Sequence, residues 1–139
     1  MIEKHQNSDD WIILPGTTIG GEVGTFRVDF TIRNRADGRE RTLNGLVDTG
    51  ASYTVIPADI LDELGIERER IRTFSLADGS QLELAIGWTE MELLGETASV
   101  YVIFGTDSRK VLLGAMALEA FALAADAKNH QLIRAELTL

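Results

Sequence analysis

The chain has 139 residues, enough for one domain with a packed core, and a formal net charge of −9. The absence of cysteine excludes thiol catalysis, thiolate zinc sites and iron–sulfur clusters, and the acidity without any Lys/Arg-rich run argues against a nucleic-acid partner. The first ten residues do not resemble a signal peptide, and no apolar run approaches the ~20 residues that span a membrane. We therefore expect a soluble, cytoplasmic protein with no membrane partner.

The N-terminal part is expected to form an extension over residues 1–20, followed by one domain over 21–139. Residues 1–10 are polar and offer little apolar surface to bury, which predicts a loose tail. The apolar run from Trp11 to Leu14 ends at Pro15-Gly16 and predicts a short strand.

A β-hairpin is predicted next. Apolar residues alternate from Val23 to Ile32, an Asp-Gly turn lies at residues 37–38, and a second strand covers 41–47. The hairpin ends at Asp48. A short strand over 53–56 follows.

A helix is expected to begin at Pro57 and end at Gly65. The remaining elements are short, and their turn signals recur about every ten residues. They are a hairpin over 70–76 and 81–86, strands over 88–94, 99–104 and 111–114, a helix over 116–121, and strands over 123–126, 131–133 and 134–139. The sum is an all-β fold, mainly β with two short helices, whose short antiparallel strands form a sandwich or partly closed barrel. Trp88 is expected in the core or in an interface.

The segment after the first hairpin carries the candidate site. Asp48 follows an apolar strand and precedes small residues, which places its carboxylate at the edge of a β-sheet core. Gly50 allows a sharp turn that brings its N–H toward the carboxylate, and the Thr49 hydroxyl can brace the loop. Ala51 and Ser52 leave room for a large ligand above.

One carboxylate is not sufficient for peptide hydrolysis, which requires a base to activate water and an acid to protonate the amide. Two carboxyl groups that share one proton meet this need, because their like charges push the two pKa values apart. The chain contains a single Asp-Thr-Gly sequence, at residues 48–50. The second carboxyl group must come from an identical chain across a two-fold axis, so a homodimer is required for activity.

Three elements in this order resemble the retropepsin-like aspartic proteases, the family of the retroviral enzymes and their bacterial and cellular relatives. They are the hydrophobic-Asp-Thr-Gly-Ala-Ser loop at 46–52, a hairpin with its tip at 77–80 in the place of the family's flap, and the hydrophobic-hydrophobic-Gly motif at 111–114 before a short helix. The resemblance covers about residues 26–133.

The resemblance implies a closed β-barrel-like acid protease fold with a single lobe and a peptide cleft at the dimer interface. Asp48 and its symmetry mate would hold the attacking water, Thr49 would bond across the axis, and Gly50 would lie near the scissile bond. The substrate-binding residues would be Ala51, Ser52, Ala77, Asp78, Gly79 and Ser80, with further pocket residues expected over 104–110. No metal and no cofactor are expected, and neither histidine has metal-ligand spacing.

Three features depart from the family pattern. The flap tip carries Asp78 and only one glycine, Ala115 stands where viral members have a polar or basic residue, and the N-terminal extension is longer than in the minimal viral enzymes. Two alternatives remain open. One alternative to an active homodimeric peptidase is a non-proteolytic peptide-binding or dimerisation module, and the other is a mainly monomeric chain that becomes active on assembly.

Overall fold

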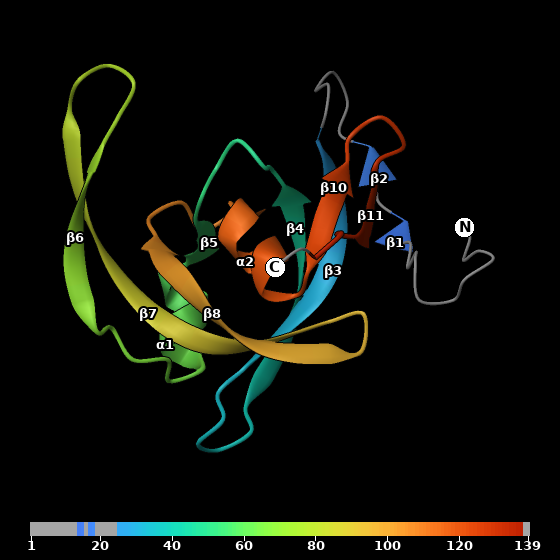
Figure 1. Cartoon of the computed structure of the whole chain (residues 1–139). Coiled ribbons are helices and arrows are strands. Elements are labelled where there is room, and N and C mark those ends of the chain that lie inside the picture. Colours follow the sequence, from blue (N-terminus) through green and yellow to red (C-terminus); the bar gives the residue numbers. More distant parts are fainter. Residues whose placement is uncertain (1–13, 16, 19–24, 138–139) are drawn as a thin grey trace.

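The computed structural model of the chain describes residues 14–15, 17–18 and 25–137, and Figure 1 labels its elements. The predictions for residues 1–13 lie outside the described residues. The described strands and helices are β1 (Leu14–Pro15), β2 (Thr17–Thr18), β3 (Phe26–Arg33), β4 (Glu40–Val47), β5 (Thr54–Pro57), α1 (Ala58–Glu63), β6 (Arg70–Ser75), β7 (Gln81–Leu93), β8 (Glu96–Gly105), β9 (Leu112–Leu113), α2 (Ala115–Ala120), β10 (Leu123–Asp126) and β11 (Gln131–Arg134).

Most of the strands belong to one sheet, in the order β2-β3-β4-β9-β5-β8-β7-β6. A further antiparallel pairing joins β3 to β7 and closes this order on itself (Figure 1). β1, β11 and β10 form a second, small sheet. The mainly β fold with two short helices that the sequence predicts is confirmed. The β3–β7 pairing is what closes the sheet.

The β3–β4 hairpin follows its predicted pattern. Phe26, Val28, Phe30 and Ile32 alternate along β3 and are all buried in the main core. The turn between the strands contains Gly38, whose φ of +80° lies in the left-handed region that glycine adopts at little cost. The hairpin therefore carries the chain to the end of β4, where the candidate site begins.

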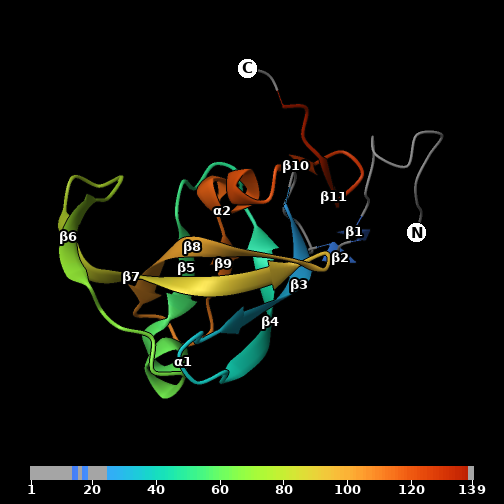
Figure 2. The same ribbon diagram turned by 60° about the horizontal axis from the view of Figure 1, so that its bottom comes forward.

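Helices α1 and α2 lie within a residue of their predicted starts. α1 follows Pro57 directly, and Gly65 with a φ of +75° lies just beyond its last turn. α1 packs against β5 and β8, whereas α2 packs against β8 and β10 (Figure 2). No helix in the described part of the chain has the length and apolar character that crossing a membrane requires.

The predicted separation of strands 81–86 and 88–94 is wrong, because β7 runs unbroken through Gly87. A Cβ atom on Gly87 would lie 2.4 Å from the carbonyl oxygen of Glu67. The glycine is needed where another stretch of backbone approaches the strand closely, and it does not end the strand.

Many strands are antiparallel, as the sequence predicts, but two of the strand pairings are parallel. β4 pairs with β9 in parallel, and β5 pairs with β8 in parallel. β9 has only two residues and therefore shows no periodicity that would reveal its partner. Its register places Val47 beside Leu113. Asp48 thus follows β4 at the level where Gly114 follows β9.

The predicted strand over 134–139 does not form in the described residues. β11 ends at Arg134, and residues 135–137 are irregular. Its partner strand β10 begins only after Ala122, whose φ of +56° breaks the extended conformation. Of the described residues, 136–137 consequently have no neighbouring strand with which to continue the pairing. Residues 138–139 lie outside the described part.

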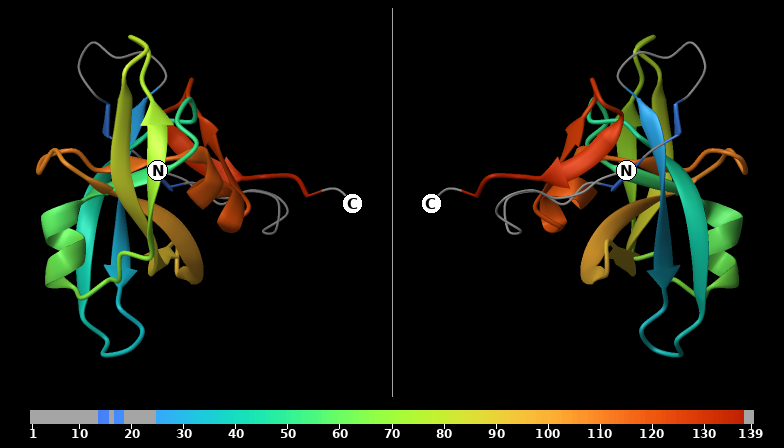
Figure 3. Two further views of the ribbon diagram at one scale, coloured as in Figure 1. Left: turned by 90° about the vertical axis from the view of Figure 1, so that its left-hand side faces the viewer. Right: turned by 90° about the vertical axis from the view of Figure 1, so that its right-hand side faces the viewer.

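The β6–β7 hairpin, called the flap below, extends away from the closed part of the sheet in Figures 1 and 2, and Figure 3 shows it from both sides. Its tip and the loop that follows β4 lie at the same end of the molecule in all three figures. The fold therefore brings the flap tip to the same end of the barrel as Asp48 and Gly114.

Candidate active site

The loop after β4, residues 48–53, is called the catalytic loop below. Its first residue is fixed to β9 by backbone hydrogen bonds. The N–H of Leu46 donates to the carbonyl of Val111 at 2.9 Å, and the N–H of Asp48 donates to the carbonyl of Leu113 at 3.1 Å. These bonds continue the parallel β4–β9 pairing past the end of the strand. Asp48 is consequently held at the edge of the barrel, where it is half-buried.

The carboxylate of Asp48 is oriented by its own loop. The N–H of Gly50 donates to Oδ1 of Asp48 at 2.9 Å, and the N–H of Ala51 donates to the carbonyl of Asp48 at 3.1 Å. No donor in the described part of the chain bonds to the second oxygen, Oδ2. Thr49 and Gly50 are exposed. One carboxylate oxygen is therefore fixed, and the other is available to a water molecule or a second carboxyl group.

The second half of the catalytic loop is tied to α2. The N–H of Ala115 donates to the carbonyl of Ala51 at 2.8 Å, and the N–H of Met116 donates to the carbonyl of Ser52 at 3.0 Å. The first N–H groups of a helix have no partner inside the helix. Here they are satisfied by the loop, which holds Ala51 and Ser52 in place.

Thr54 and Gly114 form the most buried link between the two segments. The N–H of Gly114 donates to Oγ1 of Thr54 at 3.1 Å, and Thr54 is only 1% exposed. A Cβ atom on Gly114 would lie 2.4 Å from the carbonyl oxygen of Tyr53. The glycine of the hydrophobic-hydrophobic-Gly motif is therefore required by close backbone approach. Thr54 is not among the site residues that the sequence predicts, although its position two residues before the apolar Ile56 places it on the same buried face.

The flap tip is stabilised by local bonds. The N–H of Leu76 donates to the carbonyl of Ser80 at 2.8 Å, and Gly79 has a φ of +89°. The hydroxyl and the N–H of Ser80 both donate to Oδ1 of Asp78. These two bonds, the hydroxyl first, hold the pKa of Asp78 below its ordinary value. All four predicted tip residues, 77–80, are exposed.

The structure does not join the flap tip to the catalytic loop. Within the described part of the chain, no hydrogen bond connects residues 77–80 to residues 48–52. The flap and the catalytic loop instead meet below the tip, within β6. There the ring of Phe74 meets the ring of Tyr53 edge-on, with 5.7 Å between centroids. Phe74 and Tyr53 were not among the site residues that the sequence predicts.

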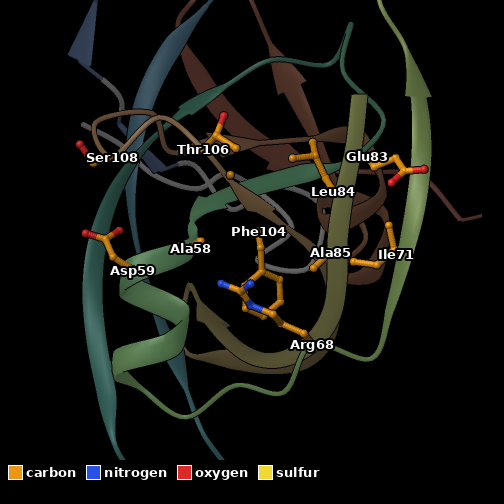
Figure 4. A pocket seen from close by; sticks show the side chains of 11 residues that line it. Ala58, Asp59, Arg68, Ile71, Glu83, Leu84, Ala85, Phe104, Thr106 and Ser108 are labelled. Carbon is orange, nitrogen blue, oxygen red and sulfur yellow. The ribbon is translucent and has the colours of Figure 1, made fainter. Parts of the chain in front are cut away.

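A cavity of about 610 Å³ lies between α1, the flap strands and the segment after β8 (Figure 4). Asp59, Ile71 and Glu83 are among its lining residues. The guanidinium of Arg68 lies 5.0 Å from the ring centroid of Phe104. The predicted pocket segment 104–110 contributes to this cavity, whereas the catalytic loop and the flap tip do not line it.

A row of apolar side chains lies on the sheet face opposite the main core. Ile86, Ile103 and Leu112 are buried but do not belong to the main core cluster. Val55 pairs with both Ile103 and Leu112, and Ile103 pairs with Ile86, so the four residues are neighbours across β7, β8, β5 and β9. The row begins beside the catalytic loop. It gives this end of the barrel an apolar wall, which the sequence pattern of any one strand does not reveal.

Comparison with known proteins connects this geometry to a family. The model of the family described as "gag-polyprotein putative aspartyl protease" matches residues 35–120, which include the catalytic loop, the flap and the Gly114 motif. The match covers more than half of the chain. The chain therefore belongs to this aspartyl protease family.

Solved structures with the same fold include viral, bacterial and eukaryotic proteins. A retropepsin-like aspartic protease from Rickettsia conorii is 20% identical, with 89% of each chain covered and a TM-score of 0.59. The EIAV protease complexed with the inhibitor HBY-793 is 19% identical, with 88% of this chain and 99% of that chain covered and a TM-score of 0.54. The retroviral protease-like domain of Ddi1 from Leishmania major is 18% identical, with 80% and 88% covered and a TM-score of 0.52. A comparison with curated protein sequences found no match.

Proposed function

We propose that this protein is an aspartic endopeptidase, in which water attack on a peptide bond is activated by a dyad of Asp48 carboxyl groups from two copies of the chain. The observation that carries this proposal is the half-buried Asp48 carboxylate. One of its oxygens is held by the N–H of Gly50, and no group in the described chain donates to the other. Such a group is suited to share a proton with an identical group across a two-fold axis.

The two carboxyl groups have different roles in the proposed reaction. The ionised one removes a proton from water as the water oxygen attacks the carbonyl carbon of the peptide bond. The protonated one donates its proton to the carbonyl oxygen, which gives a tetrahedral intermediate. Collapse of the intermediate breaks the C–N bond and transfers a proton to the leaving amine. The peptide is thereby cleaved without a covalent enzyme intermediate.

The surrounding residues have supporting roles in this proposal. In the proposed dimer, the exposed Thr49 bonds across the two-fold axis, and Ala51 and Ser52 form the floor of the peptide cleft. The flap residues 77–80 close over the substrate and exclude water. The catalytic domain spans residues 21–139, and the homodimer is the active form.

An Asp48→Asn variant tests the proposal. The variant retains the acceptor for the N–H of Gly50, so we expect it to unfold at the same temperature as the wild type, yet to lose cleavage of a random decapeptide library by at least about 10³-fold. Asp29→Asn, which changes an exposed carboxylate on β3, is the matched control and should retain full cleavage.

Two results would contradict the proposal. Undiminished cleavage by Asp48→Asn would remove Asp48 from the chemistry. Peptide binding by the wild type with no cleavage at any pH from 3 to 8 would identify a non-proteolytic peptide-binding module instead.

A further inference from the structure

Four aromatic rings form a continuous row that runs from β6 past the end of the catalytic loop to β7. The Phe74 ring meets Tyr53 edge-on, as described above. The Tyr53 centroid lies 5.7 Å from that of Tyr101, and the Tyr101 centroid lies 5.2 Å from that of Trp88, again edge-on with an angle of 88° between the rings. The segment Tyr53–Tyr101–Trp88 of this row is called the aromatic row below.

The strand register explains why these rings meet. Trp88 of β7 is paired directly with Tyr101 of β8. Tyr53 precedes Thr54, which is paired in parallel with Val102, so Tyr53 comes level with Tyr101. Side chains two residues apart on a strand share a face. The aromatic row therefore lies on the same face as the buried apolar wall and continues it toward solvent.

The aromatic row is not part of the main core. Trp88 is 50% exposed and Tyr53 is 37% exposed, and the main core cluster contains none of its three members. Beyond Trp88 the row ends at a hollow of about 330 Å³, which is lined by parts of the segments 33–36 and 65–69. Adjacent large apolar groups that are left accessible in this way are typical of a binding surface.

We propose that the aromatic row binds an aromatic side chain of the peptide substrate, at a position outside the residues that flank the scissile bond. This inference rests on the proposed function. The row begins at Tyr53, within the catalytic loop, and its two steps of 5.7 Å and 5.2 Å correspond to roughly three residues of extended peptide. In this proposal, a peptide that crosses Asp48 in extended form leaves the cleft along the row.

An aromatic occupant is favoured by the way the rings are arranged. Edge-on contacts present ring edges and ring faces together, and a further aromatic ring packs onto such a surface with the offset or edge-on geometry that aromatic pairs prefer. Trp88, the most exposed member, lies at the outer end, where an incoming side chain gains the most burial. The row consequently contributes to substrate choice and not to the bond-breaking step.

The test uses the full chain and two peptides. The first, the parent peptide, is the decapeptide that the wild-type protein cleaves best among those members of a random library that carry an aromatic residue outside the residues flanking the scissile bond. The second is an analogue in which serine replaces that aromatic residue. We expect Trp88→Ala to raise KM for the parent peptide roughly ten-fold with kcat nearly unchanged, and to leave KM for the serine analogue unchanged. Trp88→Phe should restore most of the discrimination between the two peptides. Thr97→Ala, at an exposed position near the start of β8, is the control and should behave like the wild type.

The same peptides are also titrated onto Asp48→Asn protein by calorimetry. This measurement separates failure of the proposed aromatic binding site from failure of the proposed peptidase function. If the peptides bind with an aromatic preference but the wild type does not cleave them, the result would support the aromatic binding site and contradict the peptidase activity. Cleavage with no aromatic preference would overturn the aromatic binding site and leave the proposed peptidase activity intact. An equal rise in KM for both peptides in Trp88→Ala would have the same meaning. The absence of both binding and cleavage would overturn both.

Discussion

The catalytic loop and the flap tip are both turns after β-strands, but different kinds of bonds hold them. The catalytic loop and the buried Thr54 that follows it are bonded to residues 111–116, sixty or more positions further along the chain, through Asp48, Ala51, Ser52 and Thr54. Within the described part of the chain, the flap tip is held only by bonds among its own residues, from Leu76 to Ser80, and these residues are exposed.

This difference fixes the position of the catalytic loop and leaves the flap free to move. Long-range backbone bonds fix the position of the Asp48 carboxylate, which a reaction between closely placed groups requires. A hairpin whose bonds are local can swing as a unit without breaking its turn, which a substrate cover requires. Substitutions that disturb the bonds between the catalytic loop and residues 111–116 should therefore affect the stability of the whole protein, whereas changes at the flap tip should remain local.

The largest effect is expected for Gly114→Ala. The added methyl group would approach the backbone carbonyl of Tyr53 to 2.4 Å, and backbone on both sides cannot yield as a flexible side chain would. We expect the free energy of unfolding in urea to fall by about 3 kcal/mol. Gly95→Ala, a turn position with no atom within 4 Å of the added group, is the control and should lose about 1 kcal/mol through its positive φ alone. Equal losses in the two variants would contradict the close approach.

A smaller effect is expected for Thr54→Val. Valine has nearly the shape of threonine, but it leaves the buried N–H of Gly114 without its acceptor. Urea unfolding should show a loss of about 1–2 kcal/mol. Thr97→Val, at an exposed position, should change stability by less than about 0.5 kcal/mol. A Thr54→Val protein as stable as the wild type would show that the hydroxyl is not part of the bracing.

The smallest effect is expected at the flap tip. Hydrogen bonds from Ser80 lower the pKa of Asp78 below its ordinary 3.8. The ionised carboxylate therefore stabilises the turn at pH values above 3.8, and this stabilisation is lost as the pH falls through the lowered pKa. An NMR titration should show the Ser80 amide signal moving with a midpoint below pH 3.8, without global unfolding. A midpoint at or above 3.8 would contradict these bonds, and Asp78→Asn should abolish the transition.

Local sequence signals predicted those parts of the molecule that local rules govern. The alternation along β3, the Asp-Gly turn at 37–38 and the Gly65 helix end all depend on neighbours within a few residues. The same holds for the bond between Gly50 and Asp48. Such features can be read from one stretch of sequence because the chain that forms them is continuous.

Contacts between distant segments could not be predicted in this way. Gly87 reads as the end of a strand, and only the approach of Glu67 shows why a glycine stands inside β7. Trp88 reads as a core or interface residue, yet its 50% exposure excludes it from the core. Its contact with Tyr101 depends on the β7–β8 register. Single-strand periodicity contains no information about such pairings.

The claim that the active site consists of two identical halves can be tested by mixing. Wild-type protein is held at a fixed concentration, well above that needed for dimerisation, and allowed to exchange subunits with an equal amount of Asp48→Asn protein. If the dyad is formed by Asp48 from each chain, half of the wild-type chains pair with an inactive partner, and cleavage should fall to about half. A nine-fold excess should reduce it to about a tenth. Cleavage that does not change as the variant is added would contradict a site shared between two chains.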